Sequence, residues 1–320
     1  MKKIVLVILS VVLFMTLSAC KHHDDADNII YVTVYPMQYL VEQIGGDTVI
    51  VKRVPGSTVH SESIDWSAKE IIDMINADLL FYVNAGVDTY IPNNEESTFN
   101  DGTVELIDVS QNITYNKVCY SHEHTHLYPD DNPILDCDEN SLSDDPHFWL
   151  DPVRMLQAAE LVRDKLIVAY PENSELYENN YTVLSAALVK LDDDYQEMAD
   201  NAIKPIITTA MLFTYWHARY NLEILSIVTS PHSSESIPSG SLIEFINEAQ
   251  YHFIHYILFE KNTNSPAGEQ VLDQLVQVDE DAVALYLHGL GNLTNDEIEN
   301  GSTYMSIMYD NLDVLNEATK

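Results

Sequence analysis

The chain has 320 residues, of which 46% are hydrophobic, so it is long enough for two ordinary domains with a sizeable core. Its 15 Lys and Arg side chains against 51 Asp and Glu give a formal net charge of −36. This balance argues against nucleic acid and anionic lipid as partners, because phosphates need basic side chains. It suits either a cationic partner or cargo, or a generally acidic and soluble surface.

The N-terminus predicts a targeting segment that takes no part in the fold. Two lysines precede an apolar run that is short for a membrane span, and its end, Leu-Ser-Ala-Cys, resembles a bacterial lipobox. Residues 1–19 would then be a lipoprotein signal peptide, and Cys20 would carry the lipid. The alternative is an ordinary signal with a chance cysteine. Residues 20–28 are predicted to be a flexible tether. The lipid would anchor the mature protein outside the cytoplasmic membrane.

Strand and helix signals alternate through residues 29–170, the predicted N-terminal lobe. Short runs rich in β-branched and aromatic residues predict strands at 29–34, 48–54, 79–83 and 104–109. Such alternation is typical of βαβ units and a mostly parallel sheet, which binds ligands at the carboxyl ends of its strands. His60 lies in the loop after the second strand and is therefore a candidate ligand.

Residues 119–144 lack apolar periodicity and are predicted to be an acidic, His-rich loop. Around this loop, residues 118–153 hold nine carboxylates and no Lys or Arg. Imidazoles and carboxylates without a competing cation suit a divalent metal. The interval therefore predicts a metal-collecting loop or, alternatively, a solvated linker. Its alternating histidines are His122, His124 and His126.

Two cysteines, Cys119 and Cys137, flank these histidines. An exported protein can oxidise such a pair to a disulfide, which would tie the base of the loop. Alternatively, the two thiols are soft metal ligands. The sequence favours the disulfide, because the N-terminal signal predicts export.

The stretch Asp-Pro-His-Phe-Trp-Leu-Asp-Pro at 145–152 places His147 among apolar residues and two Asp-Pro pairs. We interpret His147 as a metal ligand. Asp151 is predicted to cap a helix with proline at its first position. Residues 171–203 then form a helical pattern with almost no Gly or Pro. This pattern predicts a helix of roughly 45 Å that links two lobes.

Residues 204–320, the predicted C-terminal lobe, repeat the alternation of strands and helices. Strands are predicted at 205–209, 222–228, 254–259 and 283–287. Glu260 and His288 each follow one of these strands directly, at the end of the strand where parallel sheets bind ligands. His288 occupies the same post-strand place that His60 occupies in the first lobe.

These motifs resemble the zinc- and manganese-binding lipoproteins of ABC importers, the cluster A-I solute-binding proteins, and in particular their zinc branch. Residues 55–60 and 145–152 are similar to the first two ligand motifs of that family, 213–222 to the third, and 304–312 to the C-terminal helix. The resemblance implies an α/β fold with two Rossmann-like lobes and mostly parallel sheets. One long rigid helix would join the lobes, with the metal in the cleft.

The resemblance implies His60, His147 and His288 as metal ligands, with one uncertain place for which Glu260 and His217 are candidates. It departs from the family at Ala210, where the third motif usually begins with a ligand histidine. His217 lies seven residues later, which is two helical turns or roughly 10 Å along the axis. It therefore cannot simply replace the missing ligand.

The function implied is that of a binding protein and not of an enzyme. A monomer would capture Zn²⁺, or alternatively Mn²⁺ or another divalent transition metal, and deliver it to an ABC permease whose partner ATPase drives transport. Imidazole ligands favour zinc over manganese. The rival interpretations are a zinc-dependent hydrolase with an open fourth coordination position and a surface metal-storage or adhesion lipoprotein. A hydrolase would need a general base, and the sequence has no His-Glu-x-x-His motif.

Overall fold

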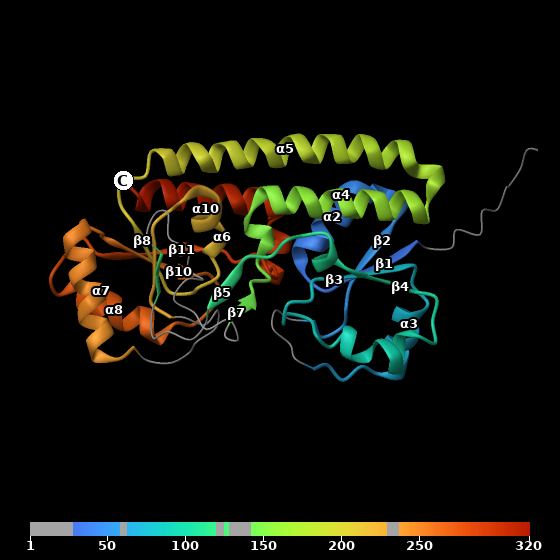
Figure 1. Ribbon diagram of the computed structural model, residues 1–320, viewed down its shortest axis with the longest axis horizontal. Helices are drawn as coiled ribbons and strands as arrows, with labels where there is room; N and C mark the ends of the chain where they lie inside the picture. Colours follow the sequence, from blue (N-terminus) through green and yellow to red (C-terminus); the bar gives the residue numbers. More distant parts are fainter. Residues whose placement is uncertain (1–27, 58–62, 120–124, 128–141, 229–236) are drawn as a thin grey trace, which may run out of the picture.

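The structure is a computed structural model that describes residues 28–57, 63–119, 125–127, 142–228 and 237–320. Two α/β lobes lie beside each other, and long helices run along one side of both (Figure 1). For Cys119 and the histidine at 126 the description is limited to the backbone. Several predicted features lie outside the described residues: the signal peptide, Cys20, His60, His122, His124 and Cys137.

The first lobe is built on a four-stranded parallel sheet with the order β2-β1-β3-β4, which confirms the four predicted strands. They are β1 (Ile29–Val32), β2 (Ile50–Arg53), β3 (Leu79–Tyr82) and β4 (Glu105–Asp108). Its helices are α2 (Tyr35–Gly45) and α3 (Ala68–Ile75). The α3 helix begins at the predicted capping box, in which Ser67 and Glu70 satisfy each other's backbone N–H groups.

Short helical turns complete the connections of the chain. They are η2 (Gly46–Thr48), η3 (Pro92–Asn94), the π-helical turn η4 (Glu95–Phe99), η5 (Val109–Gln111), η7 (Phe148–Leu150) and η8 (Pro171–Asn173). Of these, η7 matters for the site, because it lies between His147 and the N-cap Asp151. Its three residues are buried, so the chain is held firmly just after His147.

The second lobe contains a five-stranded sheet with the order β11-β10-β8-β9-β6. Its parallel strands are β8 (Ile206–Thr208), β9 (Ile224–Ser226), β10 (Tyr256–Glu260) and β11 (Val283–Leu287). Its helices are α6 (Thr214–Tyr220), α7 (Ser239–His252), α8 (Pro266–Val276) and α9 (Asn295–Glu299). The predicted strands of this lobe are therefore confirmed, although β8 and β9 are shorter than expected.

The segment predicted as a loop, 119–144, differs from that prediction at three places. β5 (Lys117–Cys119) pairs with β7 (Leu142–Asp144), and β6 (Thr125–Leu127) is an antiparallel edge strand on β9. A strand of this segment, which the sequence assigns to the first lobe, thus forms the edge of the second lobe's sheet. Three-residue strands are too short to show an alternating pattern, so the sequence carried no signal for them.

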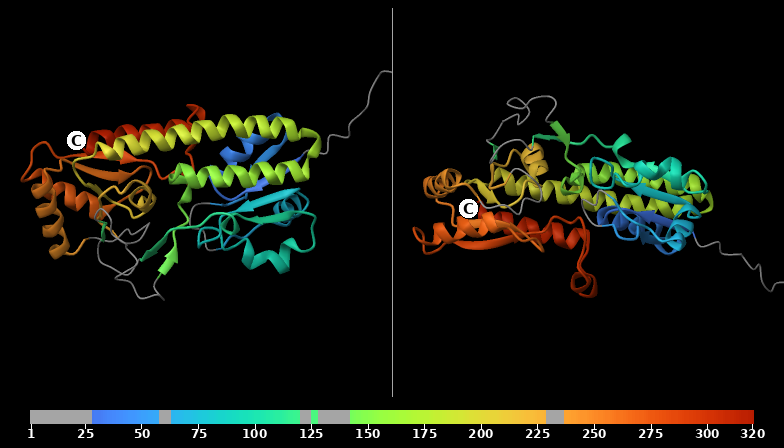
Figure 2. Two further views of the ribbon diagram at one scale, coloured as in Figure 1. Left: turned by 45° about the horizontal axis from the view of Figure 1, so that its top comes forward. Right: turned by 90° about the horizontal axis from the view of Figure 1, so that it is seen from below.

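Three long helices run along the lobes: α4 (Pro152–Ala169) at the first, α10 (Tyr304–Ala318) at the second, and α5 (Ser174–Asp200), which spans both. The 27 residues of α5 span about 40 Å. Helix α5 packs on α2 and α4 at the first lobe and on α6 and α10 at the second (Figures 1 and 2). The α/β fold with a long linking helix is therefore as predicted. In the described part of the chain, no helix is long and apolar enough to cross a membrane.

One buried apolar cluster continues from the first lobe into the second, beneath these helices. Trp149 lies in it, and its ring N–H donates to the carbonyl of Gly289 at 2.8 Å. The Tyr304 hydroxyl donates to the carbonyl of Trp149 at 2.7 Å, and the Tyr35 N–H donates to the Gly291 carbonyl at 3.1 Å. The segment after β11 is thus hydrogen-bonded to Trp149 and Tyr35, which belong to the shared core.

Candidate metal centre

A cavity of about 230 Å³ lies where the two lobes meet. Its wall is formed by His147 and Trp149, by residues 260–263 after β10, and by residues 288–292 after β11. The structure therefore brings three predicted ligands to one place, namely His147, Glu260 and His288. As predicted, the last two stand at the carboxyl ends of neighbouring parallel strands.

His147 is held by Asp145, two residues earlier. One oxygen of this buried carboxylate lies 2.6 Å from His147 Nδ1 and also accepts the backbone N–H of His147 at 3.0 Å. A carboxylate accepts hydrogen bonds, so Nδ1 carries the ring proton and the lone pair of the ring belongs to Nε2. This arrangement is common among metal-ligating histidines, because it fixes both the tautomer and the ring orientation.

Helix α6 fixes Asp145 in turn. The Thr214 hydroxyl donates to the second carboxylate oxygen, and the Tyr215 hydroxyl donates to the Asp145 carbonyl at 2.7 Å. The third family motif is thus used here to position the second motif. Sequence analysis missed the role of Asp145, although its spacing of two residues from His147 was a usable signal.

Glu260 is the last residue of β10 and lines the cavity. Its Oε2 atom is buried and accepts no hydrogen bond. Burial raises the pKa of this carboxyl, and a hydrogen bond from Thr263 and the neighbouring His147 oppose the rise. A Cβ atom on Gly289 would lie 2.8 Å from Glu260 Oε1, so a larger residue at position 289 would make the Glu260 side chain shift. A cation beside Glu260 would relieve the cost of its burial.

The neutral His288 ring is the opposite tautomer to that of His147. Its Nδ1 accepts the backbone N–H of Leu290 at 2.8 Å, so the neutral ring carries its proton on Nε2. Burial lowers the pKa of His288 and favours this neutral form, although Glu297 opposes the shift. Coordination through Nε2 would require the ring to lose that proton or to exchange its bond with Leu290.

A carboxylate and an ammonium group stand next to His288. Glu297 Oε1 lies 3.3 Å from His288 Nε2, away from the direction of an aligned hydrogen bond, and 3.0 Å from Lys261 Nζ. Burial alone would raise the pKa of Glu297, but bonds from Thr294 and Lys261 hold it at about 2. Sequence analysis did not find this pair, because its members are far apart in the chain and close only in the fold.

The remaining candidates lie elsewhere. His217 is buried on α6, its Nδ1 lies 3.0 Å from the Leu222 carbonyl, and it is not among the residues that line the cavity. Ala210 is buried between β8 and α6. The histidine of β6, His126, pairs through its backbone with Leu225. Across the described ranges, no three His, Cys, Asp or Glu side chains are grouped closely enough to hold a metal ion.

Comparison with known proteins places this architecture among zinc-uptake proteins. The family model "Zinc-uptake complex component A periplasmic" matches residues 30–318. The zinc-binding lipoprotein AdcA of Streptococcus pneumoniae is 29% identical over 324 residues, covering 100% of this chain and 61% of AdcA. The chain thus spans less than two thirds of that relative. The high-affinity zinc uptake system protein ZnuA of Bacillus subtilis is 27% identical over 288 residues, covering 89% of this chain and 86% of ZnuA.

Solved structures agree with this assignment. The Zn(II)-bound ZnuA-like domain of Streptococcus pneumoniae AdcA has a TM-score of 0.71 at 26% identity, covering 92% of this chain and 99% of that domain. The metal-dependent lipoprotein YcdH of Bacillus subtilis has a TM-score of 0.70 at 25% identity, covering 91% and 98%. With a family match over nearly its whole length, this chain belongs to the ZnuA family, the component A of zinc-uptake complexes.

Proposed function

We propose that this protein captures zinc outside the cytoplasmic membrane and delivers it to an ABC importer. The observation that carries the proposal is His147, whose Nδ1 is held by the buried Asp145 in a cavity between two lobes. The oriented imidazole and the Glu260 carboxylate line the same cavity and form a donor pair that suits zinc. The names of the relatives, which are zinc-binding and zinc-uptake proteins, support the same cargo.

The proposed ligands are His147 and Glu260, joined by His60 from the loop after β2. His288 is a further candidate, which would have to exchange its bond with Leu290. Position 210, where the family resemblance implies a ligand, carries only a methyl group. A site with three protein ligands keeps a coordination place for water or another small molecule.

Metal analysis of the purified protein, followed by competition titration, tests the proposed cargo. We expect one tightly bound zinc per chain and a weaker affinity for manganese, because imidazole suits zinc and manganese prefers oxygen ligands. The titration should include copper, nickel and cobalt, since the general affinity order places copper above zinc. Tighter manganese than zinc binding, or no retained metal, would contradict the proposal.

The proposed partners are the ABC permease and its ATPase, and the proposed anchor is a lipid on Cys20. Replacing Cys20 with Ser should release the protein from the membrane fraction, and unchanged membrane association would refute the lipid anchor. We propose the protein as a monomer, which sedimentation can check. Family membership supports capture and delivery over the hydrolase and storage or adhesion alternatives.

The histidines of the 119–144 segment are proposed as a weaker, metal-collecting site. Deleting residues 121–139 should lower the zinc stoichiometry and leave the tight affinity nearly intact, and an unchanged stoichiometry would reduce the segment to a linker. Thiol titration with and without reductant distinguishes a Cys119–Cys137 disulfide from a pair of metal-binding thiols.

A further inference from the structure

Residues 288–292, which follow β11, form a strap whose two ends are bonded to different lobes. At its start, His288 pairs with Asn311 of α10, the long helix that runs along the second lobe. The His288 N–H donates to the Asn311 side-chain oxygen at 2.8 Å, and the Asn311 amide donates to the His288 carbonyl at 3.0 Å. The start of the strap, which carries a proposed metal ligand, is therefore fixed to the second lobe.

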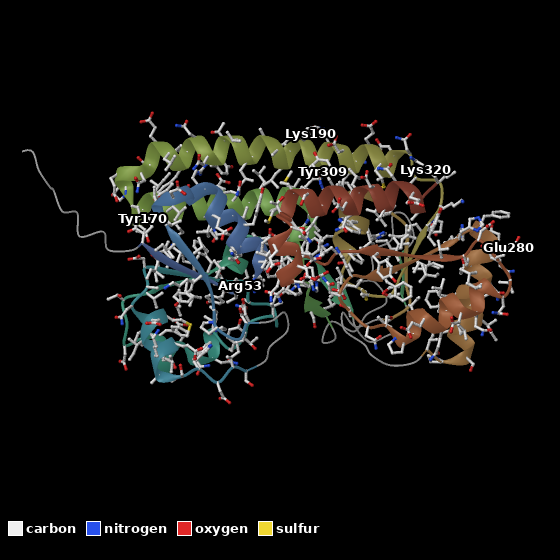
Figure 3. The ribbon with its side chains drawn as sticks, turned by 180° about the vertical axis from the view of Figure 1, so that it is seen from behind. Arg53, Tyr170, Lys190, Glu280, Tyr309 and Lys320 are labelled. Atoms are coloured by element: carbon white, nitrogen blue, oxygen red, sulfur yellow. The ribbon has the colours of Figure 1, made fainter. Side chains whose placement is uncertain are left out.

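Three donors of the first lobe hold the rest of the strap. The bonds run from Trp149 Nε1 to the Gly289 carbonyl at 2.8 Å, from the Tyr35 N–H to the Gly291 carbonyl at 3.1 Å, and from Arg53 Nη2 to Asn292 Oδ1 at 2.7 Å. Arg53 ends β2, and the same nitrogen also donates to the carbonyl of Thr33 at 2.7 Å. It lies at the junction of the lobes (Figure 3). The strap consequently ties the two lobes together beside the cavity that it lines.

The turn in the middle of the strap is strained. Leu290 has a left-handed φ of 62° and a fully buried side chain. A large side chain rarely accompanies this φ, because the Cβ atom crowds the backbone. Such a conformation persists only where the surroundings hold it, and the bonds at Gly289 and Gly291 do so on either side. The Leu290 N–H donates to His288 Nδ1 at 2.8 Å, so the strained turn is bonded directly to the ring.

The neutral His288 ring cannot keep this bond and also bind a metal. A neutral imidazole has one nitrogen that donates and one that accepts. Coordination through Nδ1 would use the lone pair that the Leu290 N–H occupies. Coordination through Nε2 would place the ring proton on Nδ1, where it would face the Leu290 N–H. Both routes therefore require the Leu290 N–H to move away, whatever other ligands the metal has.

We propose that zinc binding to His288 releases the strap from the first lobe, an inference that rests on the zinc-binding function proposed above. When the Leu290 N–H leaves Nδ1, the turn loses a bond that holds its left-handed φ, and the backbone of residues 289–291 relaxes. This relaxation turns the Gly291 carbonyl away from the Tyr35 N–H. Zinc loading thus loosens a contact between the lobes. A partner that docks across both lobes can distinguish the loaded from the metal-free protein by this difference.

Amide hydrogen exchange of the full chain, resolved by NMR without zinc and with one equivalent of zinc chloride, tests the proposal. A bound ligand generally slows exchange, because it stabilises the folded state. We expect the opposite at Tyr35 and Leu290, an acceleration of at least about tenfold, because both N–H groups lose their acceptors. The amide of Leu188, buried on α5, is the internal reference and should not accelerate. With zinc bound, unchanged or slower exchange at Tyr35 overturns the proposal and leaves the zinc-binding function intact.

Replacing His288 with Ala identifies the trigger. The other proposed ligands remain, so zinc still binds, but no ring exchanges a bond on loading, and exchange at Tyr35 should be the same with and without zinc. His255→Ala is the matched control and should retain the acceleration, because the His255 ring also has a bonded nitrogen, 2.5 Å from Asp279 Oδ2, but does not line the cavity. Acceleration that persists in His288→Ala overturns His288 as the trigger. If metal analysis of the same samples finds zinc in neither the parent nor the variants, the proposed function itself fails.

Discussion

The carboxylates near the ends of β3 and β10 differ in how their buried oxygens are satisfied. In the first lobe, Asp88 follows β3 and accepts hydrogen bonds from the Thr33 hydroxyl, from Val83 N–H at 2.7 Å and from Asn84 N–H at 2.6 Å. These bonds hold a turn in which Asn84 has a left-handed φ of 64°. The buried carboxylate of the first lobe therefore stabilises its own loop.

In the second lobe, two buried atoms at equivalent strand ends have no aligned hydrogen-bond partner. They are Glu260 Oε2 and His288 Nε2, and both side chains line the cavity. A buried polar atom without a partner costs about 1–3 kcal/mol, and such atoms are uncommon in folded proteins. Of the described side chains, Arg53 Nε and Ser57 Oγ, at and just after the end of β2, also lack a partner but do not line the cavity. An unsatisfied atom therefore indicates a ligand site here only together with the cavity, as for Glu260 and His288.

Replacing His147 with Ala should give the largest effect on metal binding. The variant loses an imidazole already oriented by Asp145, so zinc affinity should fall about a thousandfold, or about 4 kcal/mol. Competition titration with a zinc indicator measures the change. His252→Ala on α7 is the control, because His252 lies near Glu248 and is not among the residues that line the cavity. Equal affinity in both variants would remove His147 from the site.

The pH dependence of stability should report Asp88. Burial raises its pKa from 3.8 to about 6, against the hydrogen bonds from Thr33, Val83 and Asn84. The folded state therefore holds the proton more tightly than the unfolded state, so stability falls as pH rises between about 4 and about 6. The difference amounts to up to about 3 kcal/mol at 1.36 kcal/mol per pKa unit.

Urea unfolding from pH 4 to 7 measures this dependence, with Asp88→Asn as the comparison. The variant cannot ionise at this position, so its stability should vary less with pH than that of the parent. Zinc affinity should be the same in both proteins, because Asp88 is not among the residues that line the cavity. Parallel stability profiles would show that Asp88 titrates alike in the folded and unfolded states.

Glu260→Gln should separate binding from stability. Removing the charge should lower zinc affinity about tenfold, or about 1.4 kcal/mol. The same change relieves the burial that raises the pKa of Glu260, so the metal-free variant should be at least as stable as the parent at neutral pH. Calorimetric titration and thermal unfolding provide the two measurements. The exposed Glu269 of α8 is the matched control, and a loss of stability without loss of affinity would assign Glu260 a structural role.

His217→Ala should have the smallest effect on zinc affinity, within about twofold. Its ring contacts the Leu222 carbonyl at 3.0 Å and does not line the cavity. Because the side chain is buried, thermal stability should fall instead, by about 1–3 kcal/mol. A large loss of zinc affinity would place His217 among the ligands and would require the α6 segment to move.

Local patterns predicted the parts of this protein that depend on local contacts. The α5 helix followed from a long run without Gly or Pro, α3 from its capping box, and the parallel strands of both sheets from short apolar runs. His147 could be singled out because its neighbours in sequence, Asp145 and residues 148–150, are also its neighbours in space.

Contacts between distant segments were beyond such patterns. β6 pairs with β9 nearly 100 residues later, and three residues carry too little periodicity to predict a strand. The tautomer of His288 is set by the backbone N–H of Leu290. The charged groups near it are Glu297 and, paired with Glu297, Lys261. Residue type alone does not distinguish the rings of His147 and His288. Their hydrogen-bond partners differ because tertiary packing places a carboxylate beside one Nδ1 and a backbone N–H beside the other.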